Sequence, residues 1–410
     1  MNSPTDMSLP RAPRHRRLAP LLAALAMFGP FAIDTMFPAF PLIAAELDTS
    51  PLAMQQTLSV YLIAYALMSL AHGPLSDALG RRGVILAGVA VFTFASIGCA
   101  LARSIDVLLA FRALQGISAG AGLIVGRAII RDCFDGAEAQ RLMSTVSMIF
   151  GVAPAIAPIV GGWVVGHAHW SMIFWLLAAF AGALLVACMA WLPETHPPQR
   201  RIAMSARAIG ASYRFILRDR LFWPLVFAGS FGFNALFVYI ASAPVFVLDL
   251  LELGPQQFAW LFIPAIGGLM LGSFLSGRLA GRLDARRTVR LGYAIMLAAS
   301  VANLAAGLLL DTPRVPWSVL PIGLHSAGIG IAFPTVTLLL LDRFPHHRGG
   351  VSSLQAFVSL IASALIAGAI SPLVSHSAPA LATTAAIVTV LGFLAWRVSL
   401  LVEQGSGARG

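Results

Sequence analysis

Two charged side chains, Asp34 and Arg112, stand inside long apolar runs of this sequence. A charge in membrane hydrocarbon is costly, so one that occurs there is usually paired, hydrated or functional. At 1.5 Å per residue, Asp34 falls about 15 Å and Arg112 about 10 Å inward from the same surface. We therefore expect the two side chains to approach each other across an internal cavity.

This pair of residue types can do proton chemistry. A neighbouring guanidinium favours the ionised form of Asp34, whereas removal from water favours the protonated form. A proton-coupled switch needs these two opposing effects. The alternative is a static ion pair that holds the first and fourth apolar runs together, and the residues alone leave both interpretations open.

Aromatic residues and one amide could line a central pocket with a few hydrogen-bonding groups, as small-molecule sites commonly do. Phe37 lies one turn from Asp34, and Asn234 places an amide in mid-run, where it needs a partner. Each candidate could instead face lipid or pack between helices. The candidates are Phe37, Tyr61, Tyr65, Phe233, Asn234, Phe237, Tyr239 and Phe262.

Three further polar residues are expected to have structural roles. Arg127 lies near the end of the fourth run, and we expect it to snorkel or to pair near Asp77 or Asp132 rather than to touch substrate. His72 and His325 are expected to be helix contacts rather than proton carriers.

Several chemistries are disfavoured by what the sequence lacks. Cys99, Cys133 and Cys188 lie in or beside apolar runs without a CxxC or pairing pattern, which argues against a disulfide framework or a zinc site. There is no HExxH, GxSxG, Walker A motif or cluster of carboxylates, so neither an enzyme nor ATP drive is expected. We expect no metal and no cofactor, with a proton gradient as the energy source.

The elements that position these side chains must be membrane-spanning helices. The 410 residues are 58% hydrophobic and 11% charged, with a mean hydropathy of +0.84, which is beyond the balance of a soluble protein. About 20 apolar residues cross a bilayer. Twelve runs qualify: 19–43, 52–72, 84–103, 105–130, 142–166, 171–193, 221–249, 257–280, 289–310, 316–341, 350–374 and 378–401.

The sequence thus predicts an all-α polytopic membrane protein of two six-helix bundles. The expected parts are a tail at 1–18, a bundle at 19–193, a linker at 194–220, a bundle at 221–402 and a tail at 403–410. The basic N-terminus resembles a signal peptide, but the run after it is long enough to span and eleven more follow.

Arginine placement predicts the orientation. Basic residues concentrate in alternate connections, including the N-terminal tail and the linker, whereas the intervening connections are mostly acidic. Because cytoplasmic loops are rich in basic residues, we expect both termini to be cytoplasmic. The net charge of +10 is spread between apolar runs, which argues against a nucleic-acid partner. The partners expected are lipid, protons and a small molecule, bound by a monomer.

The linker is rich in proline and arginine, and we expect it to lie on anionic headgroups rather than to bind a partner. A weak repeat supports the division into halves: GPLSDALGRR begins at Gly73, and GRLAGRLDARR begins at Gly277. Parallel halves of this kind are one known transporter plan.

GPLSDALGRR suits a tight reversal between two helices. Gly73 and Gly80 permit unusual backbone angles, and Pro74 is expected to break the helix. Asp77, within one turn of Arg81, could pair with the arginines or accept hydrogen bonds from the N-terminus of a neighbouring helix. Either contact could be made in one conformation and broken in another.

These motifs resemble those of the major facilitator superfamily. The family signature in this loop is matched by Gly73, Leu75, Asp77, Gly80, Arg81 and Arg82. RALQG, from Arg112, is similar to the family's fourth-helix motif, and APIVGG, from Ala157, to its fifth-helix antiporter motif. Ala157 replaces a glycine there, which predicts a milder kink, while Pro154 and Pro158 still interrupt the backbone ladder.

IDTMFPAFP, GRAIIRDCF and APAIAPIVGGW resemble the Bcr/CflA drug-resistance efflux transporters more specifically. The resemblance implies proton-coupled export of drugs from the cytoplasm by alternating access, by a protein of the bacterial inner membrane. It implies a conformational switch formed by Gly73, Asp77, Gly80, Arg81, Arg82, Arg131, Pro154, Pro158, Gly161 and Gly162. Gly281 stands where the second loop would carry its acidic residue, which argues against a symmetrical lock.

Two other functions remain open. A permease for the uptake or export of a small polar metabolite could use the same fold, but its spans would be expected to carry more charged and amide residues. A membrane receptor that transports nothing is less favoured, because no extramembrane segment is large enough for a signalling domain.

Overall fold

The computed structural model describes residues 12–134, 136–201, 205–279, 282–345 and 347–407. Its first half contains the helices α1 (Ala12–Asp34), α2 (Phe40–Glu46), α3 (Pro51–Leu79), α4 (Arg81–Ala100), α5 (Ile105–Gly120), α6 (Gly126–Cys133), α7 (Gly136–His167) and α8 (Ser171–Trp191). The linker contributes α9 (Ala206–Leu217). The second half contains α10 (Phe222–Ala241), α11 (Ala259–Leu279), α12 (Ala285–Leu309), α13 (Leu320–Arg343), α14 (Arg348–Leu365), α15 (Ser371–Val374) and α16 (Ala378–Gly407).

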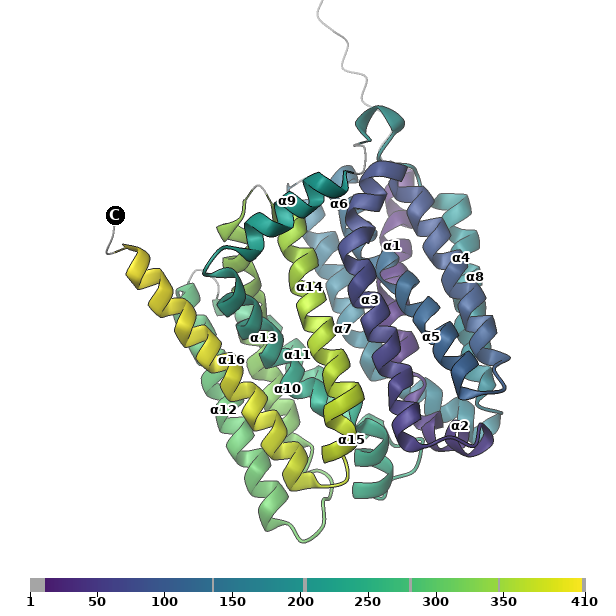
Figure 1. Cartoon of the computed structure of the whole chain (residues 1–410), viewed down its shortest axis with the longest axis vertical. Coiled ribbons are helices and arrows are strands. Elements are labelled where there is room, and N and C mark those ends of the chain that lie inside the picture. The colour runs from purple at the N-terminus through teal and green to yellow at the C-terminus, as the bar shows by residue number, and fades with distance from the viewer. Residues whose placement is uncertain (1–11, 135, 202–204, 280–281, 346, 408–410) are drawn as a thin grey trace, which may run out of the picture.

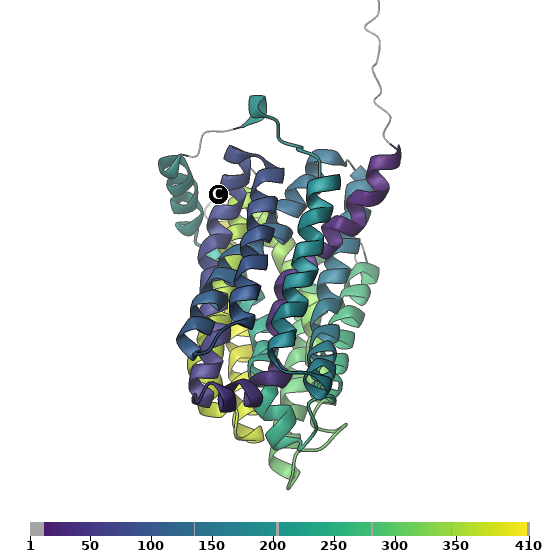
Figure 2. The same cartoon turned by 90° about the vertical axis from the view of Figure 1, so that its right-hand side faces the viewer.

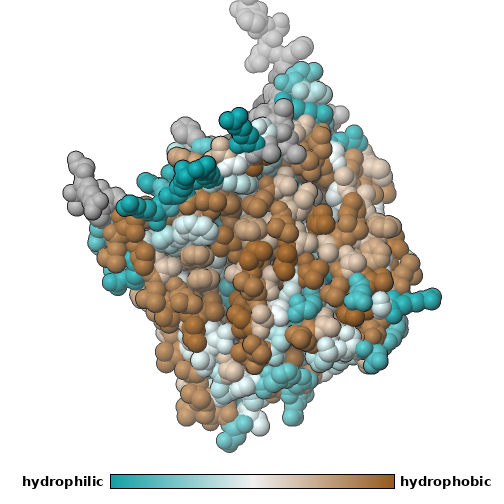
Figure 3. Space-filling view, viewed as in Figure 1, coloured by the Kyte–Doolittle hydropathy of each residue, from teal (hydrophilic) through white to brown (hydrophobic). Residues whose placement is uncertain are grey.

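The helices form two bundles that stand side by side (Figure 1). Within the described residues, 11 segments are long and apolar enough to cross a membrane, and the 32-residue α7 occupies the place of the predicted fifth span. The predicted all-α fold of twelve spans is therefore confirmed. On the side of the molecule that is in view, apolar residues cover the middle and polar ones gather toward its two ends (Figure 3).

We call the end of the molecule that carries α9 and the turn between α3 and α4 the linker face, and the opposite end, with α2, the far face (Figure 1). The N-terminal end of α1 and the C-terminal end of α16 both lie at the linker face (Figures 1 and 2). The spanning helices run nearly parallel between the two faces (Figure 2).

Several spanning segments are interrupted. The first breaks after Asp34, where the 3₁₀ turn Phe37–Ala39 separates α1 from α2. Pro38 lies at the start of that turn and Pro41 at the start of α2, and neither can donate a backbone hydrogen bond. π turns interrupt the fourth segment at Ala121–Val125 and the eleventh at Ile366–Ile370, and such turns are frequent at functional sites.

The reversal after the second span differs from the prediction. Helix α3 continues through Gly73 and Pro74 to Leu79, so Pro74 does not break it. The turn is made at Gly80 alone, whose φ of +97° is a conformation that residues with a Cβ rarely adopt. A proline within a helix removes the hydrogen bond to the carbonyl four residues earlier, here that of Leu70.

The linker helix α9, which the sequence did not predict, supplies the donor that Leu70 lacks. The hydroxyl of Tyr213 donates to the Leu70 carbonyl oxygen at 3.0 Å, and burial raises the pKa of Tyr213, so this hydroxyl remains a donor at alkaline pH. On the other side, Ser212 Oγ lies 2.9 Å from His347 Nδ1. Helix α9 thus straps the two halves together at the linker face (Figure 1).

Candidate functional site

A hollow between the two halves lies at the linker face. Its volume is about 780 Å³, and its walls come from α3 and α6 of the first half, α9 of the linker, and α13 and α14 of the second half. The polar side chains that line it include Tyr65, Asp77, Arg127, Arg131, Tyr213 and Arg348. We call this hollow the central cavity.

Polar contacts between the halves close the molecule at the far face. Gln56 Nε2 of α3 donates to the Gly368 carbonyl oxygen at 3.0 Å, and Ser59 Oγ donates to that of Ala364 at 2.9 Å. Gly368 lies in the π turn of the eleventh segment, which departs from the regular helical ladder, and Ala364 lies at the end of α14, just before that turn. Gln56 and Ser59 were missed by sequence reasoning, although polar side chains at the start of an apolar run were a usable signal.

Aromatic and backbone contacts complete this closure. The rings of Phe37 and Phe262 stack with centroids 6.3 Å apart. A Cβ on Gly162 of α7 would fall on the carbonyl oxygen of Pro255, just before α11. Two sequence-predicted pocket residues, Phe37 and Phe262, therefore belong to the far-face seal.

Asp34 lies at the C-terminal end of α1 and is only 3% exposed. Among the described residues, none forms a hydrogen bond or an ion pair with its carboxyl group. The carbonyl ends of a helix carry partial negative charge. The negative charge of an ionised Asp34 is therefore electrostatically disfavoured at this helix end.

Arg112 is fully buried and is held by neutral acceptors. Its Nη1 donates to the Ala32 carbonyl oxygen at 3.1 Å and to Gln115 Oε1 at 2.8 Å. Its Nε donates to the Thr57 carbonyl oxygen at 3.3 Å, and its guanidinium lies 4.4 Å from the Tyr61 ring centre. Ala32 is in the last turn of α1, where carbonyls lack helical donors, so Arg112 caps that helix.

The structure brings Asp34 and Arg112 to the same helix junction without pairing them. Arg112 binds the backbone two residues before Asp34, yet the described residues include no ion pair between the two side chains. Nη2 of Arg112 is buried and has no hydrogen-bond partner among those residues. The direct pair expected from the sequence is therefore not made in this conformation, although one donor remains free to make it.

Arg81 is the centre of the predicted switch. Its Nη1 bonds to Asp77 and, at 2.6 Å, to Ser76 Oγ, while its Nε lies 3.2 Å from Asp132 Oδ2. Its backbone N–H donates to Glu194 Oε1 at 3.0 Å. The network ties α3, α4 and α6 to the start of the linker. Of the two roles expected for Asp77, the structure shows the arginine pair.

Other switch residues have contacts or positions of their own. Arg82 Nη2 donates to the Met189 carbonyl oxygen at 2.7 Å, and Arg131 lines the central cavity. Pro154 and Pro158 lie within α7. A Cβ on Gly161 would fall on the carbonyl oxygen of Thr35, at the break of the first segment.

Of the eight candidate pocket residues, Tyr65 lines the central cavity. Tyr61 donates to the Gly29 carbonyl oxygen at 2.9 Å beside Arg112. Asn234 accepts from Ser363 Oγ at 2.8 Å, and Tyr239 accepts from Asn303 Nδ2 at 2.7 Å. These contacts are within one half.

Two more candidates, Phe233 and Phe237, stack on each other with centroids 6.4 Å apart. The two histidines differ in their contacts. His325 Nε2 lies 2.9 Å from Thr389 Oγ1, whereas His72 Nδ1 is buried without a partner among the described residues.

The pairing expected for Arg127 is wrong. Asp77 and Asp132 both bind Arg81, and the described residues offer no ion pair to Arg127, which lines the central cavity instead. Arg81 outcompetes it because Arg81 lies one turn from Asp77 on the adjoining helix start.

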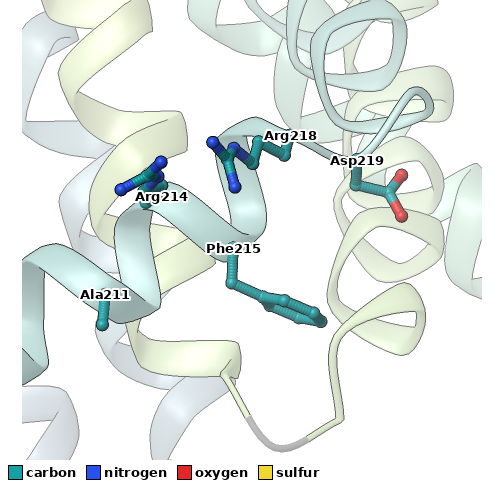
Figure 4. Close-up of a pocket in the computed structure, with 5 residues that line it drawn as sticks. All are labelled: Ala211, Arg214, Phe215, Arg218 and Asp219. Atoms are coloured by element: carbon teal, nitrogen blue, oxygen red, sulfur yellow. The ribbon is translucent and has the colours of Figure 1, made fainter.

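A second hollow of about 630 Å³ lies against α9 and the residues after it (Figure 4). Arg214 and Arg218 point to one side of it, and Phe215 points away from them (Figure 4). Asp219 accepts from Arg343 Nη2 at 2.9 Å. Because this hollow is lined by the linker region alone, the central cavity is the candidate functional site.

The sequence and the fold are both similar to those of known membrane transporters. The sequence model described as Major Facilitator Superfamily matches residues 22–367. The chain is 32% identical over 390 residues to the uncharacterized MFS-type transporter YdgK of Bacillus subtilis, covering 92% of this chain and 94% of the relative. It is 28% identical over 380 residues to the bicyclomycin resistance protein homolog of Haemophilus influenzae, covering 90% and 92%.

A solved structure shares the fold. The crystal structure of a bacterial homologue of the human lysosomal transporter Spinster aligns with a TM-score of 0.72 and 18% identity, covering 96% of this chain and 98% of the other.

Proposed function

Because the chain belongs to the Major Facilitator Superfamily, we propose that this transporter exports amphiphilic small molecules in exchange for protons, as a monomer. One observation carries the proposal. A cavity of about 780 Å³ lies between the halves at the linker face, while inter-half hydrogen bonds seal the far face. A binding site that is open at one face and sealed at the other is the starting state of alternating access.

The linker face is the cytoplasmic face in this proposal. The linker and the loop at Gly80 carry arginines, and cytoplasmic loops are enriched in them. Both termini then lie in the cytoplasm of a bacterial cell, with the protein in the inner membrane. The central cavity receives its substrate from the cytoplasm or from the inner leaflet.

Drug export is supported by the relatives and by the cavity together. A similar chain is named for bicyclomycin resistance. The central cavity mixes apolar residues with a few charged and hydroxyl groups, which suits amphiphilic compounds of drug size.

Proton coupling is assigned to Asp34 and Arg112. An ionised carboxyl group away from water is costly unless it is paired, and Asp34 has no partner among the described residues. Nη2 of Arg112 is the nearby donor that remains free. Protonated Asp34 is tolerated as it stands, whereas ionised Asp34 is drawn to Arg112, and that movement would shift α1 at its break.

The proposal is tested by growth of cells that express the protein on a panel of antibiotics including bicyclomycin. Everted membrane vesicles with an imposed proton gradient give the second readout. We expect a protective compound to dissipate the gradient when it is added to the vesicles. Protection of the cells without any effect on the gradient would contradict proton coupling. Absence of both protection and gradient dissipation would contradict drug export.

A further inference from the structure

We infer that the preferred substrates carry an acidic group, and that Arg127 and Arg131 select their anionic forms over cations. The inference rests on the proposed function and names the chemical class of substrate for the central cavity. It differs from the expectation that Arg127 only anchors its helix.

The charges on the cavity wall are unbalanced. Four arginines, Arg81, Arg127, Arg131 and Arg348, line the central cavity with only two aspartates, Asp77 and Asp132. Both aspartates bind Arg81. The cavity therefore has an excess of two positive charges.

Arg348 has a carboxylate of its own. Its Nη2 lies 3.5 Å from Asp342 Oδ1. Arg127 and Arg131 are the two lining arginines left without an ion pair among the described residues. Both of these unpaired arginines belong to α6.

The position of these two side chains on α6 (Gly126–Cys133) fits a built anion site. They are four residues apart, so they lie one above the other on one helix face, where like charges repel. An anion between them would relieve that repulsion. The π turn at Ala121–Val125 directly precedes the helix, and such turns are frequent where a helix serves a function.

Arg127 lies deeper in the membrane span than an arginine that anchors a helix end at the headgroups. It lies six residues from the end of α6, which is about 9 Å into the span. It points into the central cavity with Tyr65 of α3, rather than outward to headgroups. A charged residue at that depth that faces a cavity indicates a functional site.

The guanidinium groups of Arg127 and Arg131 determine the kind of ligand that this site would bind. Guanidinium groups bind carboxylates, phosphates and sulfonates through paired hydrogen bonds. Charges of one sign in a narrow cavity with apolar walls attract the opposite charge and repel their own. The predicted substrate is an amphiphile with an acidic group that meets Arg127 and Arg131 and an apolar body that lies deeper.

The test measures equilibrium binding to the purified full-length protein by fluorescence polarisation. Two dyes on one xanthene scaffold are compared, an anionic fluorescein and a cationic rhodamine ester. We expect the anionic dye to bind at least about tenfold more tightly, and its affinity to fall as salt is raised from 50 to 500 mM because salt screens the contact. Equal or tighter binding of the cationic dye would overturn the inference.

The double variant Arg127→Gln with Arg131→Gln should lose at least about tenfold in affinity for the anionic dye, with little change for the cationic dye. The matched control, Arg282→Gln with Arg290→Gln, removes two exposed arginines outside the cavity and should retain the preference. Equal losses for both dyes would contradict selection by charge. If the double variant does not fold, Arg127→Lys with Arg131→Lys should keep the preference, and the salt dependence of the parent remains decisive.

The outcome is separable from that of the proposed function, because binding requires no gradient. An anionic preference without proton-driven movement of either dye supports the inference and removes the proposed function. Proton-driven export that favours the cationic dye supports the proposed function and overturns the inference.

Discussion

At the scale of single residues, Asp34 and Arg112 share one junction but have different neighbours. Arg112 is satisfied by the end of α1 and by Gln115, whereas Asp34 has no partner among the described residues. Charge on Asp34 would therefore be felt at the break of the first segment. The sequence predicted both residues because charges stand out in apolar runs, but the partners of Arg112 are mainly backbone atoms, which no side-chain pattern reveals.

Gly161 offers a direct test of packing at that same break. In Gly161→Ala the added Cβ would fall on the carbonyl oxygen of Thr35, and relief requires a backbone shift that costs about 1–3 kcal/mol. We predict a lower melting temperature for the detergent-purified variant. The control is Gly151→Ala on the same helix, where a Cβ meets nothing within 4 Å; equal melting of the two variants would show that the contact is unimportant.

A substitution at Gly80 tests the reversal between α3 and α4, which is made at Gly80 and not at Pro74. Its φ of +97° and ψ of 150° lie in a region that is essentially restricted to glycine, and a residue with a Cβ costs roughly 1–3 kcal/mol there. Gly80→Ala is expected to melt at a lower temperature than Gly83→Ala, a position where an added Cβ has open space. A Gly80→Ala variant as stable as Gly83→Ala would mean that the turn relaxes without cost.

At the scale of elements, the eleventh segment is joined to α3 through its π turn. Removing the donors in Gln56→Leu with Ser59→Ala deletes two hydrogen bonds between the halves, each worth about 1 kcal/mol. We predict that the population open at the far face rises by roughly tenfold or more, measured from distances between spin labels on the two halves.

Ser69→Ala is the matched control for this prediction. Ser69 Oγ donates to the Ala66 carbonyl oxygen within α3, so its loss leaves the contact between the halves intact. A distance distribution in the double variant that matches this control would show that the π-turn contacts do not hold the far face closed.

The linker helix is the second element that joins the halves. In Tyr213→Phe the Leu70 carbonyl loses its donor, at a cost of about 1 kcal/mol. Backbone amides of α9 should exchange with deuterium several-fold faster. Tyr293→Phe, which removes a bond to Ala228 within the second half, should leave α9 unchanged; equal exchange in both variants would argue against the strap.

At the scale of the whole molecule, the fold was predictable and its contacts were not. Hydropathy identified the spans because backbone groups in lipid must be paired internally, which leaves helices as the solution. Apolar runs do not say which way a helix faces, so they could not predict that the rings of Phe37 and Phe262 stack on each other at the far face. The linker helix α9 was not predicted, because it is a short amphipathic segment in a linker that is rich in arginine and proline.

Proton-coupled export by this protein requires Asp34 to give up its proton when substrate binds. The most direct measurement is proton release from purified protein in weak buffer on addition of a substrate identified by growth. We expect release from the parent and from Asp311→Asn, which alters an exposed loop carboxylate, and none from Asp34→Asn. Release from folded Asp34→Asn equal to that of the parent would contradict the account.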